Sequence, residues 1–281
     1  MFCKFSDLNI KYMFSVDTKI EEGLEIIVLS HDHSGTSAEI IPACGAILHR
    51  FQITTGDGRI NVVDHYQNKL EFDTSVEAQG FKGCKLSPFV CRLKEGAYEF
   101  GEKEYRIEKF YLGKHALHGL LYDAPFDVIK VKGGADSASA ELLFSYKSAD
   151  PGFPFKYDCR VLYELNANNE LQVTSIIKNL EDVAIPVADG WHPYFGFNKP
   201  IDDLQLSFHA EYMLEFDEEL IPTQKKLPYA KFQAPEKIEQ SIALENLSAA
   251  PDAFNNRMGL TTLGAGKESI FRTVFRIVNT D

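Results

Sequence analysis

The sequence is poor in tryptophan and lacks long apolar runs. A single Trp stands against 21 Phe and 12 Tyr in 281 residues, and such an excess of aromatic residues suits β-strands. No stretch approaches the length of a membrane span. The first 14 residues carry Lys4, Asp7 and Lys11 and show neither a continuous apolar core nor a small-residue cleavage site. We therefore predict no signal peptide and no membrane partner.

Cysteine usage and net charge exclude further classes. The five cysteines are odd in number and scattered, without a Cys-x-x-Cys pair, which favours reduced thiols and a cytoplasmic location over a disulfide framework. The net charge of −12 repels phosphate backbones, so we predict no nucleic-acid partner. A local basic pocket could still accept a phosphorylated substrate. Nothing in the sequence indicates the oligomeric state.

Alternating apolar residues indicate strands along most of the chain. Residues 159–165 alternate, 166–169 form a polar loop, and 171–174 alternate again, which predicts a hairpin. Residues 98–107 predict a second hairpin, and residues 271–277 predict a strand with one buried face. No long helical period, repeat or linker occurs. We predict an all-β sandwich or barrel that forms a single domain over residues 1–281.

Two short runs interrupt this alternation with polar side chains. In residues 85–93, Arg92 offers a rigid fork of donors for sugar oxygens or a carboxylate. An arginine in a surface salt bridge would also fit this run. Farther along, His115 and His118 are spaced as two metal ligands can be, but no third or fourth donor follows at a readable spacing. We predict no metal, and a structural role for either histidine stays open.

A third run, residues 186–196, places His192 between Trp191 and Pro193. The apolar face of a sugar could pack on the surrounding rings while the imidazole meets the ring oxygen. A core tryptophan with an incidental histidine would also fit. Glu245 interrupts an apolar stretch, and by itself it reads as a charge at a strand end.

Taken in order, these runs resemble the motifs of the aldose 1-epimerase (mutarotase) family. SPFVCRLKEGAYEFGEKEYRI resembles the family's Asn-Arg segment and the hairpin that follows it, and HALHGLLYDAPFDV resembles its first histidine motif. DPGFPFKYDCRVLYEL is similar to its Pro-Gly turn and strand. IPVADGWHPYFGF resembles its second histidine motif, and IALENLSAAPDAFN its glutamate motif. The likeness covers about residues 40–278, in order.

The resemblance implies a galactose mutarotase-like supersandwich, a large antiparallel β-sandwich with the sugar in a groove on one sheet. It implies an enzyme that interconverts the α and β anomers of a hexose without a cofactor. His192 would be the general acid and Glu245 the general base, while Arg92 and His118 would bind the substrate. We expect the acid and the base to face each other across a space the size of a pyranose ring.

The sequence departs from the family pattern at three places. Cys91 stands where many members have Asn, and Leu120 stands where many have a second Gly. The family also has several strands and a sugar-binding Asp in a region where this chain has only residues 224–243, and that Asp has no match. Residues 237–241 look like a junction between two segments that are separated in other members of the family. We expect an additional segment there, because a true loss of strands would expose two sheet edges.

Two alternatives to the epimerase hypothesis remain. A non-catalytic carbohydrate-binding sandwich would use Trp191 and Tyr194 as a stacking platform. A hexose-6-phosphate 1-epimerase would need several cations at the groove, for which Lys82, Lys85 and Arg92 are the candidates.

Overall fold

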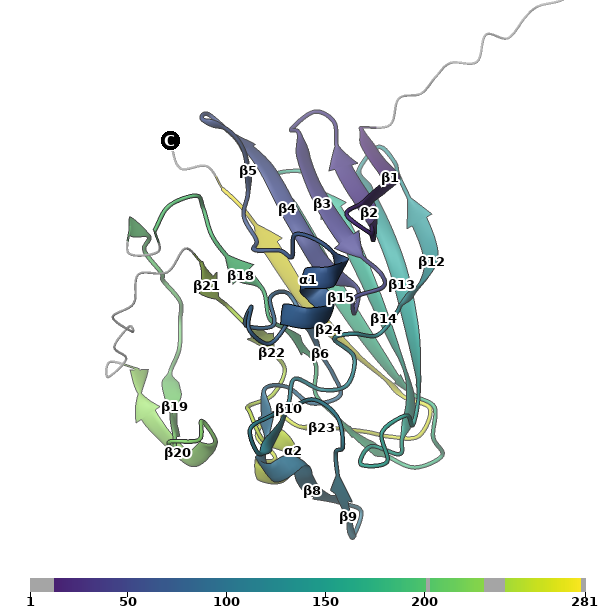
Figure 1. Cartoon of the computed structure of the whole chain (residues 1–281), viewed down its shortest axis with the longest axis vertical. Helices are drawn as coiled ribbons and strands as arrows, with labels where there is room; N and C mark the ends of the chain where they lie inside the picture. The colour runs from purple at the N-terminus through teal and green to yellow at the C-terminus, as the bar shows by residue number, and fades with distance from the viewer. Residues whose placement is uncertain (1–12, 201–202, 230–240, 279–281) are drawn as a thin grey trace, which may run out of the picture.

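The computed structural model describes residues 13–200, 203–229 and 241–278 (Figure 1). The predicted junction at residues 237–241 therefore lies outside the described residues except for Ser241. Strands dominate the described chain, and none of its helices is long and apolar enough to cross a membrane.

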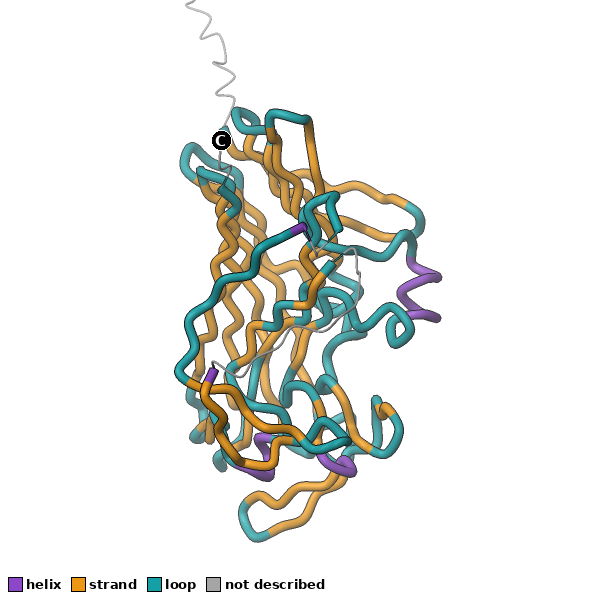
Figure 2. The backbone as a smooth tube through the Cα atoms, turned by 90° about the vertical axis from the view of Figure 1, so that its left-hand side faces the viewer, coloured by secondary structure: helices purple, strands orange, loops and turns teal. Residues whose placement is uncertain are grey.

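Two five-stranded antiparallel sheets form the body of the molecule (Figures 1 and 2). The first sheet pairs its strands in chain order: β1 (Phe14–Glu21), β2 (Leu24–His31), β3 (Thr36–Ile41), β4 (Ile47–Thr55) and β5 (Gly58–Asn61). The second sheet has the order β12 (Asp127–Lys132), β13 (Ser137–Lys147), β14 (Lys156–Asn166), β15 (Glu170–Asn179) and β24 (Glu268–Arg276).

Within the described residues, short strands form six smaller sheets beside this body. Two of them have three strands: β10 (Tyr111–Leu112), β11 (His115–Leu117) and β7 (Arg92–Leu93), and then β22 (Asn246–Leu247), β17 (Gly190–Trp191) and β6 (Lys85–Leu86). The pairs are β8 (Ala97–Phe100) with β9 (Lys103–Arg106), β16 (Ile185–Val187) with β23 (Thr261–Leu263), β18 (Tyr194–Phe195) with β21 (Ile242–Ala243), and β19 (Tyr212–Phe216) with β20 (Pro222–Pro228). The helices in the described chain are α1 (Lys69–Ser75), a 3-10 turn (Lys94–Gly96) and α2 (Ala253–Asn256).

The main core lies between the two large sheets. Apolar side chains of β2, β3 and β4 pack with those of β13, β14 and β15 in one buried cluster. Along β14, residues 157, 159, 161, 163 and 165 are fully buried and alternate with half-buried residues, as a strand with one face in the core requires. The Tyr163 hydroxyl donates a hydrogen bond to the Ala46 carbonyl over 2.8 Å and so ties the sheets together. The predicted all-β sandwich is confirmed.

The predicted hairpins are also confirmed. β14 and β15 pair directly across the turn at residues 167–169, with Leu165 opposite Leu171, and β8 pairs with β9. The predicted strand at residues 271–277 is present as β24, but its inward face is only half-buried. The reason is its position, because β24 is an edge strand of its sheet.

Candidate active site

The short strand β17 is central to the candidate site because its register fixes the position of His192. β17 pairs antiparallel with β22, and Trp191 lies opposite Asn246. The residues one step further, His192 and Glu245, are then opposite each other at the strand ends. Residues opposite each other in an antiparallel pair lie close together on the same face. His192 Nε2 accordingly lies 3.6 Å from Glu245 Oε1, although 53 residues separate the two in the chain.

A second antiparallel pair places His118. β11 pairs with β7, and Leu117 lies opposite Arg92. His118 therefore follows opposite Cys91, whose carbonyl accepts a hydrogen bond from the His118 amide over 2.9 Å. The next residue is held by the close approach of another segment. A Cβ on Gly119 would lie 2.2 Å from the Ser87 carbonyl oxygen, and its φ is +77°. Only glycine fits there.

These segments surround a cleft of about 600 Å³. All four predicted site residues line this cleft, together with residues from α1, the loop that follows it, and β18. The lining residues are Thr74, Glu77, Ala78, Gly80, Phe81, Cys91, Arg92, Leu112, Leu117, His118, His192, Tyr194 and Glu245. Such a volume accommodates a small polar ligand.

The two cleft histidines differ in their surroundings. Burial, and then the neighbouring His192 and Arg92, lower the pKa of His118 to about 3. His118 is therefore neutral near pH 7. Its ring meets the His192 ring edge-on, with centroids 4.9 Å apart, and Tyr194 stacks on His192 at 5.3 Å. Of the two, only His192 has a carboxylate in ion-pair range of its ring nitrogen, among the ion pairs found in the described residues.

Glu245 has a second partner in the cleft. The Cys91 thiol donates a hydrogen bond to Glu245 Oε2 over 3.3 Å. Burial, followed by the charge of Glu245, raises the pKa of Cys91 well above its ordinary value, so the side chain is a thiol in this state. Glu245 thus contacts His192 with one oxygen and Cys91 with the other.

The expected separation of the acid and the base is wrong in one respect. His192 and Glu245 do not face each other across a gap as wide as a sugar ring but lie in contact. Both reacting oxygens of a cyclic sugar, the C1 hydroxyl and the ring oxygen, are bonded to the same carbon. A proton donor and a proton acceptor for these two oxygens can therefore lie as close together as His192 and Glu245 do.

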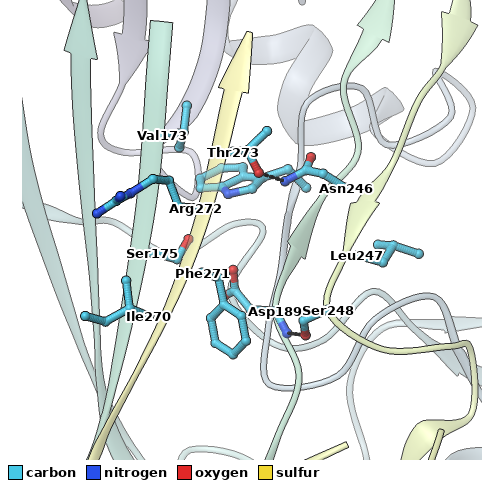
Figure 3. Close-up of a pocket in the computed structure, with 11 residues that line it drawn as sticks. Val173, Ser175, Asp189, Asn246, Leu247, Ser248, Ile270, Phe271, Arg272 and Thr273 are labelled. Carbon is cyan, nitrogen blue, oxygen red and sulfur yellow. Dashed lines mark hydrogen bonds between the residues drawn. The ribbon is translucent and has the colours of Figure 1, made fainter. Parts of the chain in front are cut away.

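The opposite face of β17 carries a different set of side chains (Figure 3). Trp191 is buried and does not line the cleft, so the stacking platform of Trp191 with Tyr194 is not present; only Tyr194 reaches the cleft. Trp191 lines a second cavity of about 340 Å³ between β17, β22, β15 and β24, where Asn246 donates a hydrogen bond to Thr273. Successive residues of a strand point to opposite faces, which separates Trp191 from His192.

Lys85 also belongs to this opposite face, so its prediction as a phosphate ligand is wrong. Its side chain is fully buried, lies 2.5 Å from Asp189 Oδ1 and 2.9 Å from Ser175 Oγ, and sits over the Trp191 ring. Lys82 lies 3.8 Å from Asp64 and is not among the residues that line the cleft. Of the three candidate cations, Arg92 alone lines the cleft in the described chain.

The fold does not place the His115 side chain in the cleft beside His118. It accepts a hydrogen bond from the Glu95 amide through Nδ1, and its Nε2 lies 3.7 Å from Glu219. It does not line the cleft. The two histidines of this run therefore do not act as a ligand pair.

Sequence reasoning missed Phe81, which packs edge-on against the His118 ring at 4.7 Å. The neighbouring Gly80 was the signal available in the sequence. Gly80 has a φ of +71°, and a Cβ there would lie 2.5 Å from the Tyr194 hydroxyl. A glycine next to an aromatic residue is typical of a turn at which another part of the molecule approaches the backbone closely. The family's sugar-binding Asp has no counterpart among the described lining residues, whose acids are Glu77 and Glu245.

The profile of the family described as aldose 1-epimerase matches residues 25–268. The chain belongs to the aldose 1-epimerase family. Its predicted family and fold are thereby confirmed, and the family consists of isomerases. An Escherichia coli K12 relative, the uncharacterized protein YihR, is 30% identical over 143 residues. That match spans 50% of this chain and 45% of the relative.

Solved structures of aldose 1-epimerase relatives share the fold. A galactose mutarotase-like protein from Clostridium acetobutylicum superposes with a TM-score of 0.75 at 15% identity, over 94% of this chain and 99% of the other. A GalM/aldose epimerase homologue from C. elegans gives 0.69 at 15% identity, over 94% and 100%. A galactose 1-epimerase from Lactobacillus acidophilus gives 0.64 at 20% identity, over 77% of this chain and 64% of the other.

Proposed function

We propose that this chain is an aldose 1-epimerase that interconverts the α and β anomers of a hexose, with His192 as the general acid and Glu245 as the general base. The observation that carries the proposal is the 3.6 Å contact between His192 Nε2 and Glu245 Oε1 on the wall of the cleft. A binding module needs no such pair, whereas ring opening needs a proton donor and a proton acceptor at neighbouring oxygens.

The reaction proceeds in balanced proton transfers. Glu245 takes the proton of the C1 hydroxyl, the bond between C1 and the ring oxygen breaks, and protonated His192 gives its proton to that oxygen. The open-chain aldehyde turns about the bond between C1 and C2. Closure on the other face then returns the proton from the ring-forming hydroxyl to His192, and Glu245 gives its proton to the new C1 hydroxyl.

The remaining cleft residues bind and orient the sugar. His118 is neutral because burial lowers its pKa to about 3, so it serves as a hydrogen-bonding group and not as the acid. Arg92 offers its fork of donors to sugar hydroxyls. Tyr194, stacked on His192, presents an aromatic face at the cleft wall.

Polarimetry of freshly dissolved α-glucose and α-galactose tests the proposal. We expect His192→Ala and Glu245→Gln each to reduce kcat by about 10²–10⁴-fold, the usual contribution of one positioned acid or base. The matched controls are His209→Ala and Glu104→Gln, which remove the same residue types at exposed positions outside the cleft, and they should keep wild-type rates.

The same assay separates the alternatives. Sugar binding without faster mutarotation in the wild type would support the carbohydrate-binding module and contradict the enzyme. A panel that includes 6-phosphates tests the phosphorylated substrate. With Lys85 buried and Lys82 off the cleft wall, we expect free hexoses to be turned over faster than their 6-phosphates.

A further inference from the structure

Three side chains with metal-binding atoms converge in the cleft from segments far apart in the sequence. They are Cys91, next to β7, His118, next to β11, and Glu245, next to β22. A thiol sulfur, an imidazole nitrogen and a carboxylate oxygen of these residues all lie within 4.8 Å of one another. The sequence offered no ligand spacing here, because strand pairing and not local sequence brings the donors together.

Their geometry approaches that of a tetrahedral zinc centre. Zinc bonds of about 2.3 Å to sulfur and about 2.0 Å to nitrogen or oxygen put the donors of such a centre roughly 3.3–3.6 Å apart. The Cys91 sulfur and the nearer Glu245 oxygen are already 3.3 Å apart. All three donors lie within 4.8 Å of one another, so ion binding requires the widest pair to approach by up to about 1.5 Å.

His118 provides a second and independent observation. It is 6% exposed, and its Nδ1 is buried without a hydrogen-bond partner in the described chain. Buried polar atoms are nearly always satisfied, so the unpartnered nitrogen of His118 indicates that this ring lacks a ligand or hydrogen-bond partner.

We infer that Cys91, His118 and Glu245 form a binding site for a divalent ion of the zinc class. A thiolate and an imidazole favour zinc and similar borderline ions over magnesium or calcium, which prefer oxygen ligands. On binding, the Cys91 S–H bond breaks, its proton passes to water, and the sulfur bonds to the ion. No oxidation or reduction occurs. His192 adjoins these three donors, because its Nε2 lies 3.6 Å from Glu245 Oε1.

The consequence for turnover rests on the proposed function. A bound ion takes one Glu245 oxygen as its ligand, weakens the carboxylate as a base, and fills space in the cleft that the sugar would occupy. It therefore competes with the sugar, and zinc acts as a reversible inhibitor of mutarotation. Cys91 stands at the position where the aldose 1-epimerase pattern commonly has Asn, and an amide is a poor zinc ligand. The zinc site is thus a property of this chain's own cleft.

The test is a titration of the full-length protein with Co²⁺, a spectroscopic substitute for Zn²⁺, followed by zinc competition with a chromophoric chelator. Cys91→Asn is the decisive variant because Asn tolerates the positive φ of 49° at this position. His118→Gln removes a second donor. Cys159→Ala is the matched control, since it removes a thiol buried in the sandwich core and outside the cleft.

The wild type and Cys159→Ala should show the sulfur-to-cobalt charge-transfer band, and Cys91→Asn should lack it. Zinc affinity should fall more than about 100-fold in Cys91→Asn and His118→Gln, because even hydrogen-bond partners of a zinc ligand are worth about 10–100-fold. A wild type without the band, or a Cys91→Asn variant that binds zinc as tightly as the wild type, would overturn the inference. The titration needs no turnover, so its result is independent of whether the protein is an epimerase.

Discussion

Two ion pairs lie on opposite faces of the sheet formed by β22, β17 and β6, and they differ in almost every respect. Lys85 and Asp189 have side chains that are 0% and 2% exposed, and Lys85 also contacts Ser175 and the Trp191 ring. His192 and Glu245 are 10% and 26% exposed and 3.6 Å apart. Nδ1 of His192 is buried with no hydrogen-bond partner in the described chain.

The two ion pairs differ in what they can contribute to the protein. A buried pair with its hydrogen bonds satisfied holds strands in register but has no lone pair or proton to offer a ligand. A looser pair at the wall of a cleft contributes little to stability and keeps its groups free for proton transfer. One short strand, β17, thus lies between the face that carries the buried Lys85–Asp189 pair, here called the structural face, and the face that lines the cleft.

The largest effect on stability should come from removing one member of the buried pair. Lys85→Met leaves Asp189 as a buried carboxylate without its cation, which costs about 3–5 kcal/mol. Urea denaturation measures the free energy of unfolding. The double variant Lys85→Met with Asp189→Leu should recover most of the loss. If the double variant is destabilised by as much as the two single variants together, Lys85 and Asp189 do not stabilise the fold through each other.

A smaller loss of stability should follow a decrease in pH. Burial lowers the pKa of both His118 and His49 to about 3. The unfolded chain, with histidine near 6.5, binds these protons first, so the stability is fully present above about pH 6.5 and is lost as the pH falls toward 3. As the pH falls from 6.5 to 5, each of these histidines should lower the free energy of unfolding by up to about 2 kcal/mol.

Urea denaturation at about pH 7 and about pH 5 measures this loss. His118→Gln and His49→Gln should each show a shallower decline than the wild type. His209→Gln, which changes an exposed histidine, should leave the decline unchanged. Equal declines in all four proteins would show that the two buried histidines are not responsible.

Asn246→Ala should lower the free energy of unfolding by about 1 kcal/mol. This residue lies beside Glu245 but points to the structural face, where its amide donates a hydrogen bond to Thr273 over 2.6 Å. The loss of one such bond costs about 1 kcal/mol. Thermal unfolding should therefore show a modest decrease, while kcat stays within about threefold of the wild type, which is roughly 0.6 kcal/mol. A large loss of activity would mean that the two faces are not separate.

The smallest effect on stability should come from Glu245→Gln. The partly exposed and loosely paired carboxylate contributes no more than about 1 kcal/mol to folding. The free energy of unfolding should change by less than that amount while mutarotation is lost. A variant destabilised as strongly as Lys85→Met would make Glu245 a structural residue and would weaken its assignment as the base.

The sequence predicted most of the sandwich, because alternation in residues 159–174 is a direct signature of a half-buried hairpin. It also supplied Arg92, His118, His192 and Glu245, because their order along the chain follows a family pattern. All four line one cleft.

The errors at Lys85 and Trp191 share one cause. Their runs were read as polar or aromatic clusters, but the face on which a side chain lies depends on the register of β17 with its neighbours. A register between strands more than 50 residues apart has no local signal. The convergence of Cys91 with His118 and Glu245 was hidden for the same reason.

The most direct test of the account is a double-mutant cycle on anomer exchange at equilibrium, followed by NMR exchange spectroscopy of glucose. If His192 and Glu245 act as one acid–base unit, the variant carrying both His192→Ala and Glu245→Gln should exchange anomers about as slowly as the slower single variant. Losses that multiply, or a single variant that keeps the wild-type rate, would contradict the central claim that this contact opens the sugar ring.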